Sequence, residues 1–280
     1  MHKIVMKKEL SKKIDYSISL LRKGERLALS LNPDEGYYLA FSGGKDSQVL
    51  YHLAIMSGVR FRAYYNITSI DPPENVYFIR ENYPDVVFVH PKKNFFRLIE
   101  EKGLPTIRTR YCCERLKEGY GAGSVVLTGV RAAESRKRAS MAEIEIFSRR
   151  KEHEGKLRAR TVEQLEENEH RCIKGKDKVM MRPIFNWTDE DVWAFLHLYG
   201  FPINPCYVKA GRVGCMFCPF ASREQIEMYA AEYPNFERQI LRSLRKFWEK
   251  STKHYIGSPE EYYDWWKSKK SMSDYIKMHG

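Results

Sequence analysis

The sequence contains no long run of apolar residues. No window approaches the roughly eighteen uncharged apolar residues that a membrane-spanning helix needs. Residues 1–8 are rich in lysine and have neither a long apolar core nor a small-residue cleavage site, so they do not form a signal peptide. Internal repeats and low-complexity tracts are also lacking. We therefore expect no membrane contact and a cytoplasmic protein whose thiols stay reduced.

Acidic residues are in the minority. Asp and Glu number 36 against 48 Lys and Arg, which gives a formal net charge of +12. The basic residues are spread along the chain, a distribution that favours an anionic partner such as a nucleotide or nucleic acid. The alternative is a basic surface that is merely solvated. A chain of 280 residues is long enough for one well-packed α/β domain and a smaller appendage.

A polar, glycine-containing turn follows an apolar segment in the first quarter of the chain. Residues 37–41 favour a strand, residues 42–47 read Ser-Gly-Gly-Lys-Asp-Ser, and a helical pattern then continues to Gly58. Unpaired amides and the positive end of the helix dipole point into such a turn, and together they attract anions. The sequence therefore predicts a phosphate site.

Each side chain of the turn suits that chemistry. Glycine lets the backbone approach a phosphate closely, serine donates a hydroxyl, and Lys45 adds a positive charge. Asp46 fits beside phosphate chiefly when it holds a divalent cation such as Mg²⁺. The residues expected to contact the phosphates are Ser42, Gly43, Gly44, Lys45 and Ser47. The alternative is an ordinary turn in which Asp46 or Ser47 caps the helix. A Walker A loop is excluded because Leu39 and Asp46 stand where it needs Gly and Ser or Thr.

Strand and helix patterns alternate along the first 130 residues. Alternation of this kind implies right-handed crossovers and a mainly parallel sheet with helices on both faces, a doubly wound α/β fold. Ligands of such sheets lie beyond the carboxyl ends of the strands, where the 42–47 turn and residues 129–131 both fall. The predicted helices cover about 9–31, 75–83 and 95–102, and the predicted strands 37–41, 61–68, 86–90 and 124–130.

The composition changes after residue 130. Residues 131–178 are highly charged and poor in apolar residues, which predicts a mobile insertion that orders over a ligand. Thr188 starts another helix, and the chain from Ser222 onward is mainly helical and rich in aromatic residues. These aromatics are predicted to pack within a helical cap, with base stacking as the alternative. We expect a nucleotide-binding domain over 1–204 and a cysteine loop with a helical cap over 205–280.

Four of the six cysteines fall in two tight pairs. Cys112 is adjacent to Cys113, and Cys215 and Cys218 form a Cys-x-x-Cys followed by Pro219. Either pair alone could be core residues or a redox pair. Both pairs in one reduced chain favour a four-thiolate metal site, which suits zinc or an iron–sulfur cluster. Spacing alone does not choose the metal, although adjacent cysteines fit one tetrahedral ion awkwardly and fit separate irons of a cube more easily.

Two cysteines remain outside these pairs, Cys172 and Cys206. Each is predicted to be an ordinary buried or loop residue, with a reactive thiol or a substitute metal ligand as the alternative.

The 42–47 motif after an apolar strand resembles the PP-loop of the ATP pyrophosphatases (adenine nucleotide alpha hydrolase-like) and of the phosphoadenosine phosphosulfate (PAPS) reductases. The resemblance implies that the loop holds the phosphates of ATP or of a sulfonucleotide, with Gly129, Arg131 and Arg136 also at the nucleotide. Lys45, Asp46 and Arg131 would then be catalytic. The likeness extends to residue 220 and is carried by residues 71–74, 110–117, 129–136, 187–193 and 214–219.

The cysteine pattern resembles that of the adenylylsulfate reductases in the same family. This resemblance implies that Cys112, Cys113, Cys215 and Cys218 hold a [4Fe–4S] cluster, with zinc as the alternative. Reductases of the family use a cysteine near the C-terminus as nucleophile, and no cysteine follows Cys218 in this sequence.

The expected function is therefore ATP pyrophosphatase-type activation for sulfur transfer. An acceptor oxygen, for example on nucleic acid, would attack the α-phosphorus and release pyrophosphate. Sulfur from a donor protein such as a cysteine desulfurase would then displace AMP. One alternative is a PAPS or adenylylsulfate reductase that uses Cys172 or Cys206 as its thiol. Another is a nucleotide-gated module that binds nucleic acid without turnover.

Overall fold

The computed structural model describes residues 2–148, 158–169, 173, 177–251 and 257–279. Its contacts divide the chain into two compact units. Unit 1 contains residues 1–65, 74–89 and 119–213, and unit 2 contains residues 66–73, 90–118 and 214–280.

Unit 1 is built around a mixed, mostly parallel sheet, as the sequence predicts. The strands are β1 (Tyr37–Phe41), β2 (Phe61–Asn66), β3 (Val87–Val89), β4 (Val125–Leu127), β5 (Ile144–Phe147), β6 (Arg158–Ala159) and β7 (Lys178–Met181), in the spatial order β3-β2-β1-β4-β7-β5-β6. Strand β1 pairs in parallel with β2 and β4, and β4 pairs in parallel with β7. Strand β5 is antiparallel to β7 and to β6. The α/β prediction is thereby confirmed.

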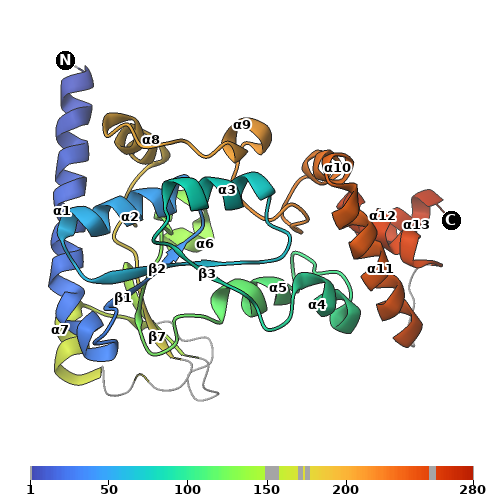
Figure 1. Cartoon of the computed structure of the whole chain (residues 1–280), viewed down its shortest axis with the longest axis horizontal. Helices are drawn as coiled ribbons and strands as arrows, with labels where there is room; N and C mark the ends of the chain where they lie inside the picture. Colours follow the sequence, from blue (N-terminus) through green and yellow to red (C-terminus); the bar gives the residue numbers. More distant parts are fainter. Residues whose placement is uncertain (1, 149–157, 170–172, 174–176, 252–256, 280) are drawn as a thin grey trace. The chain divides into compact units, whose positions relative to one another are not determined.

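Helices cover this sheet and carry much of the buried core. The longer ones are α1 (His2–Leu31), α2 (Lys45–Ser57), α3 (Pro73–Asn82) and α8 (Asp189–Leu198), and the short turns are η2 (Ala132–Glu134), α6 (Arg136–Ala139), α7 (Val162–Gln164), η4 (Leu165–Glu169) and α9 (Cys206–Ala210). Figure 1 shows α2 and α3 along the same face of the sheet, and α1 packs against α2. Leu21 of α1, Leu39 of β1 and Leu50 of α2 have no exposed surface.

Short sequence patterns, such as turn glycines, correctly predicted the position of most helices and strands of unit 1. Helix α2 begins after the glycines of the turn and ends at Gly58, whose φ of 74° suits a glycine C-cap. The residues of strand β3, predicted as 86–90, are only half-buried because β3 lies at an edge of the sheet.

The prediction for residues 131–178 was wrong in part. Ile144–Phe147 forms β5, which adds an antiparallel strand beside β7 instead of belonging to a charged insertion. The strand was missed because it contains a charged residue, Glu145. In the structure the side chains of Glu145 and Arg182 form an ion pair at 2.9 Å and are 4% and 5% exposed. A buried carboxylate is tolerated in a sheet when a guanidinium neutralises it.

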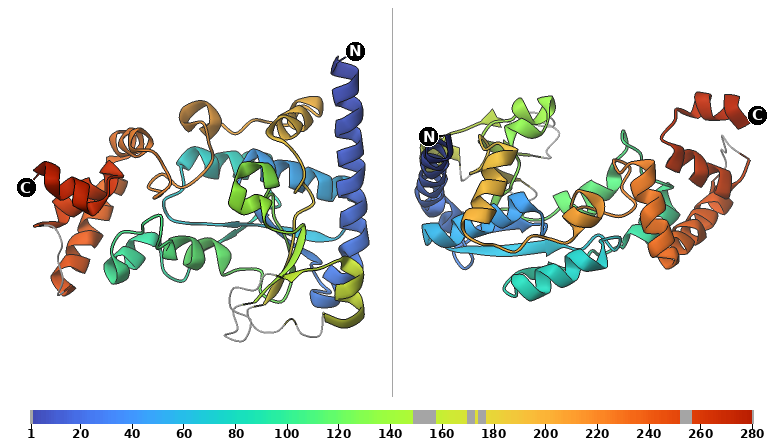
Figure 2. Two further views of the ribbon diagram at one scale, coloured as in Figure 1. Left: turned by 180° about the vertical axis from the view of Figure 1, so that it is seen from behind. Right: turned by 90° about the horizontal axis from the view of Figure 1, so that it is seen from above.

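Unit 2 is mainly helical. Its elements are α4 (Phe95–Lys102), α5 (Tyr111–Cys113), η1 (Glu114–Glu118), α10 (Arg223–Glu232), α11 (Pro234–Lys250), α12 (Pro259–Ser268) and α13 (Met272–His279). Helix α11 packs against α4 and α12, and Figure 2 shows the four C-terminal helices gathered together. Tyr263 and Trp266 are buried, and the indole N–H of Trp266 donates to the carbonyl of Pro105 at 2.6 Å. These two aromatics pack within the helical unit, as expected.

The compact units cut the chain differently from the predicted division into 1–204 and 205–280. The cut falls between residues 213 and 214, and unit 2 also takes in residues 66–73 and 90–118, because α4 packs on α11. The predicted domain division itself stays a prediction. No helix in the described ranges is both long and apolar enough to cross a membrane.

Candidate functional site

The Ser42–Ser47 loop lies in unit 1 between the carboxyl end of β1 and the first turn of α2. Gly43 has a φ of +76°, and a Cβ there would stand 2.3 Å from Oδ1 of Asn75, so only glycine fits. Gly44 caps the helix in an extended conformation, and as a glycine it offers no side-chain cap to the first-turn amides. The positive end of α2 therefore has no capping group from its own N-cap residue, and the hydroxyl of Tyr207 accepts the Lys45 amide instead.

Two buried asparagines hold the carbonyl groups of this loop. Asn204 Nδ2 donates to the Gly43 carbonyl at 2.9 Å and to Asn75 Oδ1 at 2.7 Å, and Asn75 Nδ2 donates to the Ser42 carbonyl at 3.2 Å. Asn75 and Asn204 are 2% and 0% exposed. Because N–H and C=O point in opposite directions across a trans peptide, these bonds turn the amides of Gly43 and Gly44 to the other side. The two asparagines thus fix the orientation of both peptide groups.

The two serines of the loop bond mainly to the loop itself. Ser47 Oγ accepts from the Ser42 amide at 3.1 Å and donates to the Gly44 carbonyl at 2.8 Å. Ser42 Oγ accepts from the Gly44 amide at 3.3 Å. In this structure Ser47 therefore braces the turn, and the expected contact of either hydroxyl with phosphate stays a prediction.

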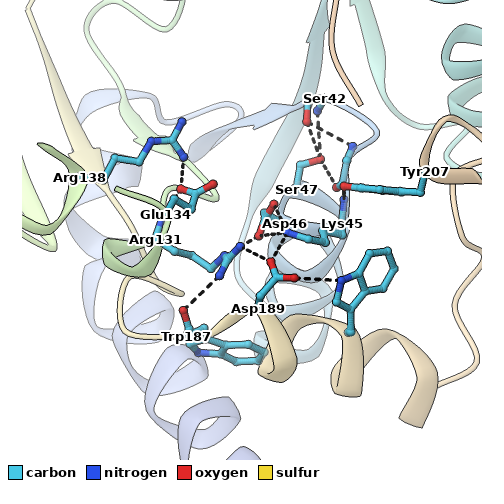
Figure 3. Close-up of polar contacts among 12 residues, drawn as sticks. Ser42, Lys45, Asp46, Ser47, Arg131, Glu134, Arg138, Trp187, Asp189 and Tyr207 are labelled. Carbon is cyan, nitrogen blue, oxygen red and sulfur yellow. Dashed lines mark hydrogen bonds and ion pairs between the residues drawn. The ribbon is translucent and has the colours of Figure 1, made fainter. Parts of the chain in front are cut away.

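Two cations and two carboxylates meet in front of the loop (Figure 3). Arg131 Nε lies 2.6 Å from Asp46 Oδ1, and Arg131 Nη2 lies 2.9 Å from Asp189 Oδ1. Lys45 Nζ lies 2.8 Å from the same Asp189 oxygen and 3.2 Å from Asp46 Oδ2. The hydrogen bond from Lys45 lowers the pKa of Asp189 and keeps it ionised. The side chain of Arg131 is 3% exposed, whereas that of Asp189 is 54% exposed.

The end of β4 brings Arg131 to this cluster. A Cβ on Gly129 would come within 2.9 Å of the Asp46 backbone, so glycine permits the close approach of the two segments. The Arg131 amide donates to Glu134 Oε2 at 3.0 Å, which fixes the turn that follows. Of the two arginines that the resemblance places at the nucleotide, only Arg131 lies at the loop. Arg136 is exposed, and among the described residues it forms no ion pair with residues 42–47.

A tyrosine hydroxyl occupies the first amide of α2. The Lys45 N–H donates to Tyr207 Oη at 2.8 Å, and burial raises the pKa of Tyr207 so that the phenol stays neutral. Trp193 contacts Tyr207 edge to face, with ring centroids 5.0 Å apart, and its indole N–H donates to Asp189 Oδ2 at 3.2 Å. Residues of α8 and α9 therefore contact the loop directly.

Four of these residues were not predicted as part of the site: Asn75, Asp189, Asn204 and Tyr207. Asp189 gave one usable signal, since it follows the helix-capping Thr188, but an acid in a first turn is common in any helix. The other three reach the loop through long-range contacts and carry no local motif.

The four paired cysteines all belong to unit 2. Cys112 and Cys113 lie in α5, and Cys215 and Cys218 lie in the loop before α10. Electrostatic interactions connect Cys112 with Cys113 and Cys215, and Cys215 with Cys218. A hydrogen bond between the two adjacent thiols raises the pKa of Cys112 and lowers that of Cys113.

A tight turn at residues 68–71 supports Cys215. The two oxygens of Asp71 accept from the Thr68 amide at 2.7 Å and its hydroxyl at 2.8 Å, and Cys215 Sγ lies 3.4 Å from that hydroxyl. The carbonyl of Ile70 accepts from the Met216 amide at 2.9 Å. The charge of Cys215 raises the pKa of Lys117, so an ammonium group stands beside this thiol. Burial raises the pKa of the Cys215 thiol, and the charge of Lys117 and the contact with Thr68 offset only part of that rise.

The donor sets fit the expected metals to different degrees. Mg²⁺ is commonly held by one or two carboxylates together with substrate phosphates, and Asp46 fits that need. Four thiols in one unit are the right kind and number for zinc or a [4Fe–4S] cluster. Within the described residues, however, no three His, Cys, Asp or Glu side chains stand close enough to hold an ion. The four-cysteine site therefore stays a prediction.

The two remaining cysteines differ in what the structure says of them. Cys206 lies in unit 1 at the start of α9 and is fully buried. Cys172 lies outside the described residues.

Comparison with known proteins decides the family. A family model described as the phosphoadenosine phosphosulfate reductase domain matches residues 36–221. The chain belongs to this family. The resemblance seen in the sequence is therefore confirmed, and the matched range contains the PP-loop, Arg131, Asp189 and all four paired cysteines.

Individual relatives of this PAPS reductase-family chain are distant. It is 26% identical over 233 residues to an uncharacterized protein of Methanocaldococcus jannaschii, covering 78% of this chain and 43% of the relative. It is 28% identical over 208 residues to sulfate adenylyltransferase subunit 2 of Sulfurovum sp., covering 70% of this chain and 66% of the relative. The chain spans about half the length of the first two curated relatives that it matches, 43% and 52%.

A solved structure supports the fold. The FMN adenylyltransferase of Candida glabrata, in complex with FAD and inorganic pyrophosphate, aligns with a TM-score of 0.50 at 14% identity. The alignment covers 75% of this chain and 65% of that protein.

Proposed function

We propose that unit 1 binds ATP over the Ser42–Ser47 loop and catalyses attack on the α-phosphorus with release of pyrophosphate. One observation carries the proposal: the side chains of Lys45 and Arg131 converge with the Asp46 carboxylate at the N-terminus of α2. A helix N-terminus flanked by two cations suits a polyphosphate, and the carboxylate suits the metal that accompanies it.

Each group has a defined task in this reaction. The amides of Gly43 and Gly44 and the ammonium of Lys45 bind the β- and γ-phosphates. Arg131, held by Asp46, faces the charge that develops as the bond between the α-phosphorus and the pyrophosphate oxygen breaks. Mg²⁺ at Asp46 would supply further neutralisation of the leaving group. An acceptor oxygen forms the new bond to the α-phosphorus, and a sulfur nucleophile later displaces AMP from the adenylylated acceptor.

We propose ATP and not a sulfonucleotide as the substrate because of how much of the chain each relative matches. Similarity to sulfate adenylyltransferase subunit 2 runs over 70% of this chain. Similarity to the adenosine 5'-phosphosulfate reductase of Burkholderia cepacia, at 30% identity, covers only 25% of the chain. The longer match supports adenylyl transfer.

The cysteines of unit 2 are proposed to hold a [4Fe–4S] cluster, with zinc as the alternative. Cys112, Cys113, Cys215 and Cys218 would be its ligands, and a cluster would supply a centre that binds sulfur or transfers electrons. The proposed partners are a nucleic acid that provides the acceptor and a sulfur-donor protein such as a cysteine desulfurase. The net charge of +12 supports an anionic acceptor.

Pyrophosphate release tests the proposal. The full chain, purified without oxygen, is incubated with ATP, Mg²⁺ and candidate acceptors, including sulfate, DNA and RNA. We expect acceptor-dependent pyrophosphate, abolished by Lys45→Ala and by Asp46→Asn and retained by Lys137→Ala, an exposed lysine of α6. Nucleic-acid binding without turnover would instead identify a binding module. Absence of pyrophosphate with every acceptor contradicts the proposed reaction.

A second candidate is a sulfonucleotide reductase, which the match to adenosine 5'-phosphosulfate reductase favours. It predicts sulfite release from adenylylsulfate or PAPS in the presence of a thiol reductant. Loss of sulfite in Cys206→Ser or Cys172→Ser would identify the nucleophile. Complete burial of Cys206, and a pKa that burial raises to about 11, make that thiol a poor nucleophile.

A further inference from the structure

One carboxylate oxygen of Asp189 lies between the two cations of the site. Asp189 Oδ1 accepts from Lys45 Nζ at 2.8 Å and from Arg131 Nη2 at 2.9 Å (Figure 3). An oxygen held at once by a lysine and an arginine has the partners that phosphate recognition uses. The site therefore contains an anion of its own before any ligand arrives.

Asp189 differs from Asp46 in how firmly it is held in the cluster. The side chain of Asp46 is 22% exposed and belongs to the loop itself, whereas that of Asp189 is 54% exposed and extends from the first turn of α8. Water can solvate Asp189 when it leaves. Arg131 would keep its bonds to Asp46 Oδ1 and to the Trp187 carbonyl. Departure of Asp189 thus leaves no buried charge without a partner.

A second internal group occupies the neighbouring amide. Tyr207 Oη accepts the Lys45 N–H at 2.8 Å, at the first residue of α2, where an anion bound at a helix N-terminus would bond. Trp193 connects the two groups, because its indole N–H donates to Asp189 Oδ2 and its ring contacts Tyr207. Asp189 and Tyr207 together bond to the Lys45 amide, the Lys45 ammonium and the Arg131 guanidinium.

We propose that Asp189 and Tyr207 are internal ligands that hold the phosphate position in the free protein and are displaced by the phosphates of the nucleotide. The proposal rests on the proposed nucleotide site and adds the residues that set how strongly an anion must compete for it. Anions of low charge then bind poorly, whereas a polyphosphate supplies several oxygens and displaces both groups.

Binding of inorganic pyrophosphate tests the displacement. Isothermal titration calorimetry on the full chain, with EDTA present, measures Kd for the wild type and for Asp189→Asn. We expect Asp189→Asn to bind about two- to tenfold more tightly, the range for removal of two partly exposed ion pairs that compete with the ligand. Asparagine keeps the size of the side chain, and a thermal melt confirms folding.

Glu190→Gln is the matched control. Glu190 lies beside Asp189 in the first turn of α8, so the substitution removes the same charge from the same helix end. Among the described residues it forms no ion pair with Lys45 or Arg131. We expect its Kd for pyrophosphate to change by less than about twofold. Equal tightening in both variants would mean a general charge effect and would overturn the proposal.

Tyr207→Phe provides a second variant that does not depend on the folding of Asp189→Asn. Removal of the hydroxyl frees the Lys45 amide, so pyrophosphate should bind more tightly here as well. An unchanged or higher Kd in both variants overturns the proposal. A repeat of the titration with Mg²⁺ tests whether Asp189 instead holds the cation. In that case Asp189→Asn would weaken the binding of Mg²⁺–pyrophosphate and leave metal-free binding unchanged. That result would also overturn the proposal.

The outcomes separate this inference from the proposed reaction. If Asp189→Asn binds pyrophosphate more tightly but the wild type does not turn over ATP, the proposed reaction is contradicted and the displacement of Asp189 is supported. If the wild type turns over ATP but the wild type and Asp189→Asn bind pyrophosphate with equal affinity, the proposed reaction is supported and the displacement of Asp189 is contradicted. Absence of pyrophosphate binding in all variants contradicts both.

Discussion

Arg131 Nε lies 2.6 Å from Asp46 Oδ1, although 85 residues separate the two in the chain. This bond ties the first turn of α2 to the segment after β4, so the loop and the arginine are positioned as one piece. Because Arg131 is almost fully buried, its orientation is set by protein contacts and not by solvent. The pair is the basis for the first prediction.

Arg131→Lys should weaken ATP binding at least tenfold. Lysine keeps the charge but cannot bond Asp46, Asp189 and the Trp187 carbonyl from three nitrogens, and a lost charge-assisted hydrogen bond costs about 1.5–3 kcal/mol. The same substitution at exposed Arg136 should change Kd by less than about twofold. Calorimetric titration with ATP and Mg²⁺ measures both. Equal losses in the two variants would instead support the role that the resemblance gives to Arg136.

Asn204→Ala should destabilise unit 1 and loosen the loop. It leaves the Gly43 carbonyl and Asn75 Oδ1 without their donor, and a buried acceptor without a partner costs about 1–3 kcal/mol. Urea unfolding gives the free energy, and hydrogen exchange of the Gly44 amide reports the loop. Asn82→Ala is the control, because exposed Asn82 also donates to a backbone carbonyl, that of Phe78 at 2.9 Å. A loss of stability no larger than the control's would contradict the proposed tether.

The paired cysteines predict metal content. Protein purified without oxygen should contain iron and show cluster absorption, and Cys112→Ser or Cys215→Ser should remove both signals. Cys206→Ala should keep them, because Cys206 is a buried residue of unit 1 and is not one of the four proposed ligands. Iron and zinc analysis with absorption spectra makes the measurement. Near-stoichiometric zinc without iron would show that the protein holds zinc instead of an iron–sulfur cluster.

Acid should destabilise the protein through His52. Burial against Phe201 and Tyr83 lowers the pKa of His52 from 6.5 to about 4. The unfolded chain then binds a proton below pH 6.5 that the folded chain binds only near pH 4. The free energy of unfolding should therefore fall as the pH drops from 6.5 to 4, by at most about 3 kcal/mol.

His52→Phe should remove that part of the pH dependence. Phenylalanine can still stack on Phe201 and does not titrate. Urea unfolding at several pH values measures the slope, with His90→Phe, at an exposed position, as the control. A wild-type slope in His52→Phe would show that other groups cause the acid sensitivity.

Local signals in the sequence predicted the elements that depend on local physics. Phe95–Lys102 was placed to the residue, because Asn94 caps its start and Gly103 ends it. The PP-loop was recognisable because position 43 has a positive φ and no room for a Cβ, so it needs a glycine. Such features are encoded in a few consecutive residues.

Features that depend on contacts between distant segments were missed. Tyr207 and Asn204 follow Pro202 in a stretch without a motif, and they reach the loop only because α8 and α9 fold back onto it. Strand β5 was hidden because its Glu145 looks like a surface residue until Arg182 is seen beside it. Pairing partners of this kind cannot be read from composition or periodicity.

Strands β5 and β6 also affect how the protein behaves in solution with other copies of itself. Without β5, strand β7 would present a row of unpaired backbone groups at the border of the sheet, and such rows recruit strands from other chains. In the described residues that border is instead β6, with only Arg158 and Ala159. A border so short is a poor template for intermolecular pairing, so this addition to the parallel sheet should protect the protein from aggregation at high concentration.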